Sequence, residues 1–214
     1  AVIFAVSGLA PASPVAADAP VLSLPAACEP GRTCFVQNHV DLDAGPGVRD
    51  YACGAATYDG HKGVDIRLLS AAEAASGVAV LAAAPGIVKG RRDGMADAIA
   101  REREAAGLAG RECGNGVVLD HGDGWETQYC HMRQGSIAVQ VGDKIARGQP
   151  IGEIGYSGLA AFAHLHLSVR KSGAVVDPFS GLSPGDACLA EPRRARGLWD
   201  DTAKAAFPVP GALF

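Results

Sequence analysis

Short runs of strand-forming residues, separated by turns that contain glycine, constrain the fold of this chain more than any other feature. The 214 residues include 28 glycines and 13 prolines, and such frequent helix-breaking residues favour short strands over a helical bundle. Residues 115–132 hold two β-rich runs on either side of a turn at 122–124, which predicts a hairpin. Residues 137–155 and 165–178 repeat this alternation of strand and turn. The pattern predicts a mainly β fold built on an antiparallel sheet.

One segment departs from this pattern. Residues 93–110 are rich in Ala, Glu and Arg, which are good helix formers. We therefore expect a short helical insertion at about 91–112, placed between two strands and with its charged residues in solvent. A second, shorter helical piece is expected at 70–75.

The chain divides into four segments. Residues 1–17 contain an apolar run followed by small residues, as in a secretory signal. Residues 18–57 are rich in Pro, Gly and Asp and predict an irregular N-terminal arm. The β-rich pattern defines a main domain at 58–180, and residues 181–214 are expected to form a C-terminal extension packed on that domain.

Composition and charge limit the functions open to the chain. The net charge is −4 and the isoelectric point is near 5.8, whereas an electrostatic nucleic-acid binder would carry a clustered basic surface. The N-terminal apolar run, of about ten residues, is too short to span a bilayer as it stands. We therefore expect no nucleic-acid partner and no stable membrane span in the mature, exported chain.

An even number of cysteines accompanies the signal-like start and indicates disulfides formed in an oxidising compartment. The six are Cys28, Cys34, Cys53, Cys113, Cys130 and Cys188. Many pairings are possible, and the sequence alone does not choose among them. One consistent set closes a local loop between the first two cysteines and links the fourth to the fifth beside the predicted hairpin, which leaves the third with the sixth. A cysteine-bound zinc is the rival interpretation, but the chain has no CxxC spacing.

His61 and Asp65 occur together in the stretch DGHKGVDI. Residues two or four apart in an extended strand point to the same face, so these two side chains would face one side together. Gly63 lies between them on that face and leaves open space for a shared ligand, while Val64 and Ile66 would face the core. The alternative interpretation is an ordinary His–Asp pair on an exposed strand.

The stretch AFAHLHLSVR places two histidines two positions apart inside an apolar run. In a strand, His164 and His166 share one face, and Leu165 and Leu167 share the other. Burying a histidine is costly unless its nitrogens find partners. The pair is therefore either two satisfied core residues or part of a functional site.

His131 ends the predicted strand WETQYCHM. Functional residues are often found at strand ends and in the loops that follow them. Strand alternation places His131 on the face of Thr127 and Tyr129, opposite to Cys130. Taken alone, this histidine fits a structural role better than a catalytic one.

Two histidines and one carboxylate, with a fourth position open, form a typical catalytic zinc site. His61, Asp65 and one histidine of the pair near residue 165 would supply that set. Zinc there would polarise a scissile carbonyl and lower the pKa of bound water to about 7, and the remaining histidines could move protons or stabilise developing charge. The chain has no HExxH motif, so the common helical arrangement of zinc proteases is not expected.

Five motifs follow one another along the chain: HKGVD, GNGVVLDHGDG, QYCHM, VGDKIARGQPIGEIG and AHLHLSVRKSGAVVDP. In this combination and order they resemble the lysostaphin-like (LytM-type) zinc metallopeptidases. The resemblance covers about residues 58–178 and leaves the insertion at 91–112 unmatched. It implies an antiparallel β-sheet folded into a roll with a groove.

The resemblance also implies a set of site residues. The zinc ligands of the family match His61, Asp65 and His166. Its two catalytic histidines match His131 and His164, and which of the two is the general base stays open.

Other residues near these motifs have weaker interpretations. His39 and His121 match no motif of the family, so we interpret them as a loop residue of the arm and a hairpin residue beside the turn. Tyr58 and Tyr129 could orient substrate, although cores and groove walls use tyrosine as often. The arm at 18–57 could occlude the groove as an inhibitory segment.

The activity that the resemblance implies is zinc-dependent hydrolysis of peptide bonds in the stems or crossbridges of bacterial peptidoglycan. The expected protein is a periplasmic or secreted monomer whose partners are peptidoglycan peptides. One alternative is a catalytically inactive LytM-type regulator that activates another cell-wall hydrolase, although all three ligand positions are filled here. Another alternative is a wall-binding module that keeps only the β-roll.

Overall fold

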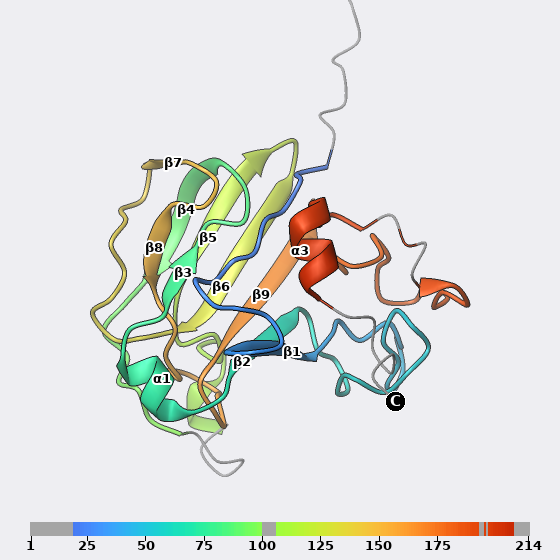
Figure 1. Ribbon diagram of the computed structural model, residues 1–214, viewed down its shortest axis with the longest axis horizontal. Helices are drawn as coiled ribbons and strands as arrows, with labels where there is room; N and C mark the ends of the chain where they lie inside the picture. The colour runs from blue at the N-terminus through green and yellow to red at the C-terminus, as the bar shows by residue number, and fades with distance from the viewer. Residues whose placement is uncertain (1–18, 100–105, 193–194, 196, 208–214) are drawn as a thin grey trace, which may run out of the picture.

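An antiparallel sheet of eight strands forms the main layer of the described residues in the computed structural model (Figure 1). Residues 19–99, 106–192, 195 and 197–207 are described, and the signal-like segment expected at 1–17 lies outside them. The strands lie in the order β1-β2-β9-β6-β5-β4-β7, with β10 paired to β9. Their bounds are β1 Cys34–Asn38, β2 Val64–Leu68, β4 Gly86–Arg92, β5 Asn115–Gly122, β6 Trp125–Met132, β7 Lys144–Ile145, β9 His164–Lys171 and β10 Ala174–Val176. The predicted mainly β, antiparallel fold is confirmed.

A second, two-stranded sheet packs against one face of the main sheet. It consists of β3 (Ala79–Leu81) and β8 (Pro150–Glu153), which pair antiparallel. Leu165 of the main sheet and Ile151 of the small sheet are fully buried and belong to the same hydrophobic cluster. Because the core lies between the two sheets, the other face of the main sheet is free to carry a site.

Two tight turns connect neighbouring strands of the main sheet. Asp123 and Gly124 join β5 to β6 with φ values of 48° and 79°, and Ser172 and Gly173 join β9 to β10 with φ values of 49° and 86°. Two consecutive residues with positive φ are typical of the turn that best matches the twist of a hairpin. Both predicted hairpins are therefore confirmed, and each turn has glycine at its second position.

The region expected to form a helical insertion at about 91–112 differs from the prediction. The strand β4 continues through Arg92, and residues 93–99 form no helix. A single 3-10 turn, η1 (Ala106–Leu108), follows, while residues 100–105 lie outside the described part of the chain. The expected helix is thus wrong for residues 93–99.

Hydrogen bonds to other segments explain why residues 93–99 are not helical. Asn115 donates from Nδ2 to the backbone oxygen of Met95 at 2.7 Å and accepts from its backbone nitrogen at 2.8 Å. The carboxylate of Asp97 accepts from the backbone nitrogens of Tyr156 and Gln134, both at 2.9 Å. These long-range contacts hold the segment extended and override the local helix propensity, which is a weak preference.

Two short α-helices lie within the described residues. The predicted piece at 70–75 is α1 (Ala71–Ala75), which starts at a capping box formed by Ser70 and Glu73. The second helix, α3 (Asp201–Ala206), lies in the C-terminal extension and has Asp200 as its N-cap. None of the described helices is long and apolar enough to cross a membrane.

The N-terminal arm is attached to the rest of the molecule at several points. Its strand β1 pairs with β2 at the edge of the main sheet, as Figure 1 shows. Disulfides link Cys28 to Cys34 and Cys53 to Cys188, so the second one joins the arm to the C-terminal extension. The third disulfide, between Cys113 and Cys130, completes the set that the sequence allowed but did not select.

Candidate active site

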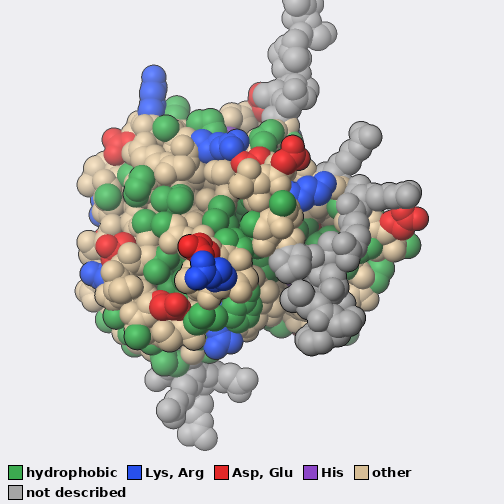
Figure 2. Space-filling model, viewed as in Figure 1, with side chains coloured by type: hydrophobic (Ala, Val, Ile, Leu, Met, Phe, Trp, Pro, Cys, Tyr) green, Lys and Arg blue, Asp and Glu red, His purple; other side chains and the backbone are tan. Residues whose placement is uncertain are grey.

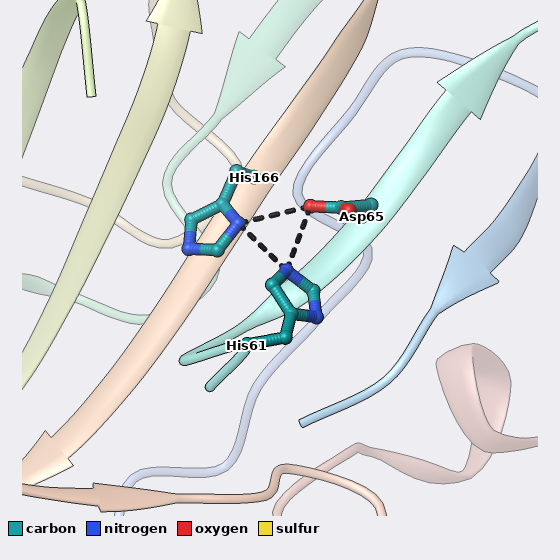
Figure 3. A group of neighbouring side chains, drawn as sticks. All are labelled: His61, Asp65 and His166. Atoms are coloured by element: carbon teal, nitrogen blue, oxygen red, sulfur yellow. Dashed lines mark hydrogen bonds and ion pairs between the residues drawn. The ribbon is translucent and has the colours of Figure 1, made fainter. Parts of the chain in front are cut away.

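Three side chains converge on the free face of the main sheet (Figure 3). His61 precedes β2, Asp65 lies in β2, and His166 lies in β9 as the cross-strand partner of Asp65. His61 Nε2 lies 3.2 Å from Asp65 Oδ1 and 3.1 Å from His166 Nδ1, and the latter two atoms are 2.9 Å apart. One donor atom from each residue thus forms a compact triangle, and both His61 and Asp65 are buried.

Gly63 makes this approach possible. A Cβ atom at this position would lie 2.6 Å from His166 Nε2 and 2.6 Å from the backbone oxygen of Leu167. The sequence predicted open space at Gly63 for a shared ligand, whereas the structure fills that space with the His166 ring. The glycine therefore lets the β9 histidine reach the two side chains of the β2 segment.

Hydrogen bonds on the outer side of each histidine fix which ring nitrogen faces the triangle. His61 donates from Nδ1 to the backbone oxygen of His39 at 2.6 Å. Ser168 donates from Oγ to the backbone oxygen of Lys62 at 2.5 Å, so Oγ accepts from His166 Nε2 at 3.2 Å. His61 Nε2 and His166 Nδ1 are therefore left as the inward-facing nitrogens, as a metal ligand requires.

Asp65 is held on its outer side by the arm. Its Oδ2 accepts a hydrogen bond from Asn38 Nδ2 at 2.8 Å, while its Oδ1 faces His61 and His166. Burial raises the pKa of Asp65, but the contacts with His166 and His61 outweigh burial and hold that pKa well below its usual range. The carboxylate is thus ionised, which is the form that binds metal.

The donor set fits zinc. Zinc takes imidazole nitrogens and carboxylate oxygens at about 2.0–2.2 Å in tetrahedral geometry, which separates neighbouring ligand atoms by roughly 3.3–3.5 Å. The three donor atoms here are 2.9 to 3.2 Å apart. Two histidines and one carboxylate leave a fourth tetrahedral position for water or substrate.

His131 and His164 form a second pair beside the triangle. Their ring centroids are 4.6 Å apart, and the His131 ring lies 5.9 Å from that of His166. His131 donates from Nδ1 to the backbone oxygen of Ser157 at 2.8 Å, and His164 donates from Nδ1 to that of Phe162 at 2.9 Å. Each ring thus leaves Nε2 available for proton transfer. His164 Nε2 lies 3.6 Å from Asp65 Oδ1.

Both histidines are kept neutral by their surroundings. Burial, together with the neighbouring His164 and His166, lowers the pKa of His131 to about 3. Burial also lowers the pKa of His164, although Asp65 opposes this effect. A neutral imidazole with one nitrogen bound to a carbonyl can accept a proton at the other.

The strand alternation predicted for His131 is wrong. The expected face, shared with Tyr129, is the core side, because Tyr129 is fully buried and pairs with Leu167. His131 has a φ of 61°, and the register between β5 and β6 shifts between the pairs Asn115–Met132 and Val117–Tyr129. This bulge turns the His131 side chain to the side of His166, which regular alternation does not anticipate.

A groove of about 440 Å³ runs over this face of the sheet. It is lined by Tyr58, Gly60, His61, Lys62, Glu112, Cys113, Gln128, Cys130, His131, Leu159, His166, Ser168 and Arg170. No described residue of the arm, 19–57, is among them. The described part of the arm therefore supports the site from the side and does not cover the groove.

The two tyrosines singled out from the sequence have different positions. Tyr58 lines the groove, is 52% exposed and stacks on the His61 ring at 4.3 Å between centroids. Tyr129 is buried, and its hydroxyl accepts from the backbone nitrogen of Ala83 at 2.8 Å. The suggested role in orienting substrate is therefore wrong for Tyr129, whereas Tyr58 remains a candidate.

Sequence reasoning missed the residues that support the triangle. The sequence indicates only a loop position for His39, yet its backbone oxygen orients His61. No motif marks Asn38 or Ser168 in the sequence, although Asn38 holds Asp65 and Ser168 holds His166. The alternation in β9 would have placed Ser168 on the face of His166, but no local signal pointed to the arm. His121 is a hairpin residue as expected, with Nδ1 donating to the backbone oxygen of Pro85.

The fold and the site together define a class, namely antiparallel β-sheet proteins that have a His/Asp/His cluster beside a groove. The match to a family model is more specific, because the model described as peptidase family M23 matches residues 59–178. The chain belongs to peptidase family M23.

Curated relatives and solved structures agree with this family. The peptidoglycan DD-endopeptidase ShyA of Vibrio cholerae is 37% identical over 71 residues, which are 33% of this chain and 16% of that protein. The DD-carboxypeptidase/endopeptidase Mpg of Neisseria meningitidis is 30% identical over 126 residues, which are 58% of this chain and 23% of that protein. The matched region thus spans less than a quarter of either relative.

A solved structure supports the fold at lower identity. A chain from the SpoIIQ–SpoIIIAH pore-forming complex superposes with a TM-score of 0.53 at 20% identity, covering 78% of this chain and 94% of that one. At this identity the likeness concerns the fold alone.

Proposed function

We propose that this chain is a zinc-dependent endopeptidase that hydrolyses peptide bonds in the stems or crossbridges of bacterial peptidoglycan. The observation that carries the proposal is the convergence of three atoms that can bind a metal. Hydrogen bonds on the outer side fix the tautomers of the two histidines among them, and two neutral histidines lie beside them. We take residues 58–180 as the peptidase domain. The name of the relative ShyA, a peptidoglycan DD-endopeptidase, supports peptidoglycan as the substrate, and the name of Mpg supports an endopeptidase.

In this proposal His61 Nε2, Asp65 Oδ1 and His166 Nδ1 hold the zinc. Zinc bound there supplies a Lewis acid that polarises the scissile carbonyl and lowers the pKa of water to about 7. His131 and His164 act on the substrate side through Nε2. One accepts the proton released as water attacks, and once protonated it can donate that proton to the leaving amine. The other stabilises the charge that develops on the carbonyl oxygen.

The setting of the reaction follows from the same proposal. Three disulfides favour an oxidising compartment, and peptidoglycan lies outside the cytoplasm. We therefore propose a periplasmic or secreted protein that acts as a monomer on wall peptides.

Metal analysis combined with mass spectrometry of digested peptidoglycan tests the proposal. The purified protein should bind one zinc and release peptides from a wall preparation. His166→Ala should lose both the zinc and the hydrolysis, because it removes one of three donors. A fully metallated and fully active His166→Ala protein would refute the assignment. Stoichiometric zinc without hydrolysis, together with stimulation of a wall amidase, would instead favour the regulator.

A further inference from the structure

The groove face of the main sheet carries charged side chains beside the candidate metal centre. The cross-strand pairs of β9 and β6 on this face form successive rows, which are His166–Cys130, Ser168–Gln128 and Arg170–Glu126. Rows two residues apart in a strand are separated by about 7 Å. A group in the middle row therefore lies roughly two extended peptide residues from the metal ligands.

Arg170 bends back from the outer row toward the metal centre. It donates from Nη2 to Oε1 of Gln128 in the middle row at 2.5 Å. Gln128 Nε2 lies 3.4 Å from Cys113 Sγ, and Cys113 is bonded to Cys130 in the innermost row. This chain of contacts holds the guanidinium over the groove, and within the described part of the chain most of its five N–H donors have no other acceptor.

Among the residues that the structure describes, no acid forms an ion pair with Arg170. Its cross-strand partner Glu126 pairs with Lys89 instead. Lys62, the other cation of the groove, forms no ion pair within the described residues either. Glu112 is the one carboxylate among the described residues that line the groove. The described lining of the groove thus carries Lys62 and Arg170 against Glu112, in a chain of net charge −4.

The face shown in Figure 2 has a different pattern, because blue and red side chains lie interspersed on it. Exposed charges of both signs are the ordinary condition of a protein surface. Positively charged side chains that line a groove without acidic partners raise the local concentration of anionic ligands. The arrangement in the groove therefore favours an anionic substrate.

We propose that Arg170, assisted by Lys62, forms a subsite for a free carboxylate within about two residues of the scissile peptide bond. The proposal rests on the endopeptidase function and names its substrate class. A guanidinium binds a carboxylate through two parallel hydrogen bonds. Crosslinks through diaminopimelate have a free carboxylate next to the linking amide, whereas glycine bridges offer these cations no partner. The subsite therefore selects acidic stem crosslinks over glycine bridges.

A matched pair of substrates tests the subsite. Both are D-alanyl–diaminopimelate peptides of the same sequence, and they differ only in whether the carboxylate beside the scissile amide is free or converted to the carboxamide. The zinc-loaded wild-type protein should cleave the acid with a kcat/KM about 10- to 100-fold above that of the amide, as expected for a hydrogen-bonded charge pair.

Substitutions at Arg170 assign that preference to its source. In Arg170→Gln the ratio of the two kcat/KM values should fall to near one, and Arg170→Lys should keep an intermediate ratio. Lys144→Gln removes one positive charge from β7, outside the groove, and should keep the wild-type ratio. Zinc content is measured for each variant, so that a change in the metal site is recognised.

The outcomes separate this proposal from the function on which it rests. Equal cleavage of acid and amide by the wild-type protein overturns the subsite and leaves the endopeptidase function standing. An equal loss on both peptides in Arg170→Gln also overturns it, because that result indicates a structural role. If the wild-type protein cleaves neither peptide, the endopeptidase function fails on these substrates. The Kd values of the acid and the amide for the wild-type and Arg170→Gln proteins then test the subsite. A preference for the acid that Arg170→Gln abolishes then supports the subsite, and equal Kd values overturn it.

Discussion

The two parts of the candidate site are built in different ways. The metal-binding triangle lies on a regular ladder, where Asp65 of β2 and His166 of β9 are directly paired. His131 lies at the end of β6, at a bulge with a φ of 61°. The ladder places side chains by keeping its register, and the bulge places one by breaking it. Regular pairing thus builds the proposed metal site, while a local irregularity brings the proposed catalytic histidine to it.

Each part also has its own support. The ladder depends on close backbone approach at Gly63, on the hydrogen bond that Asn38 donates, and on those that His39 and Ser168 accept. The bulge depends on neighbouring loops, since the backbone nitrogen of His131 donates to the backbone oxygen of Cys113 at 2.8 Å. Substitutions in the ladder should therefore act through the metal, and substitutions at the bulge should act on catalysis alone.

The largest effect is expected from Gly63→Ala. The new Cβ would lie 2.6 Å from both the His166 ring and the backbone of Leu167, and the backbone cannot move aside without breaking the ladder. We expect loss of zinc and a fall in wall-peptide hydrolysis to below about one thousandth, because the nucleophile depends on the metal. Metal analysis and peptide release measure both effects.

Gly90→Ala is the matched control for this substitution. Gly90 also lies in a strand of the main sheet, but a Cβ there meets no heavy atom within 4 Å. This control should keep zinc and activity. A Gly63→Ala protein that is zinc-replete and active would show that the ladder tolerates a wider approach than the structure indicates.

A smaller effect, confined to catalysis, is expected from His131→Ala. Hydrolysis should fall by about 10²- to 10⁴-fold, the usual contribution of a positioned acid or base. Zinc should be retained, because no donor atom of the triangle comes from β6. His121→Ala removes a histidine from the same hairpin outside the groove and should keep the activity. Loss of zinc in His131→Ala would contradict the separation of the two parts.

The smallest effect is expected from Ser168→Ala, which removes the acceptor of His166 Nε2–H. The zinc Kd should rise by about 10- to 100-fold, as for other outer-side partners of metal ligands. Competition with a chromophoric chelator measures this change. Ser168→Thr keeps the hydroxyl and should restore most of the affinity. An unchanged Kd in Ser168→Ala would mean that β9 alone orients the His166 ring.

The regular part of the site could be predicted from the sequence because strand alternation is a local property. Period two in β9 places His164 and His166 on one face, but the meeting of His166 with Asp65 depends on the pairing of β2 with β9, and Gly63 marks a close approach where the sequence predicts open space. The hairpins could be predicted for the same reason, since their turns contain residues that tolerate positive φ. The structure brings together all five residues that the motifs singled out, His61, Asp65, His131, His164 and His166.

The remaining features depend on contacts that are distant in sequence. The orientation of His131 follows from a register shift between β5 and β6. Alternation along one strand cannot predict such a shift, because the shift depends on how two strands pair. Residues 93–99 have a helical composition, but side chains such as Asn115 and Asp97 hold them in another conformation. The sequence of the arm is irregular because the arm pairs at an edge of the sheet, donates one hydrogen bond from Asn38 and accepts one at His39, none of which needs a periodic pattern.

The position of β1 has a consequence for how the catalytic unit is delimited. The family model begins at residue 59, but the amide of Asn38 and the carbonyl of His39 lie about twenty residues earlier in the chain. A protein cut at the family boundary would keep all three proposed ligands and lose two of the groups that orient them. The proposed catalytic unit of this chain is therefore larger than the region that the family model matches, because it includes β1 and the residue that follows it.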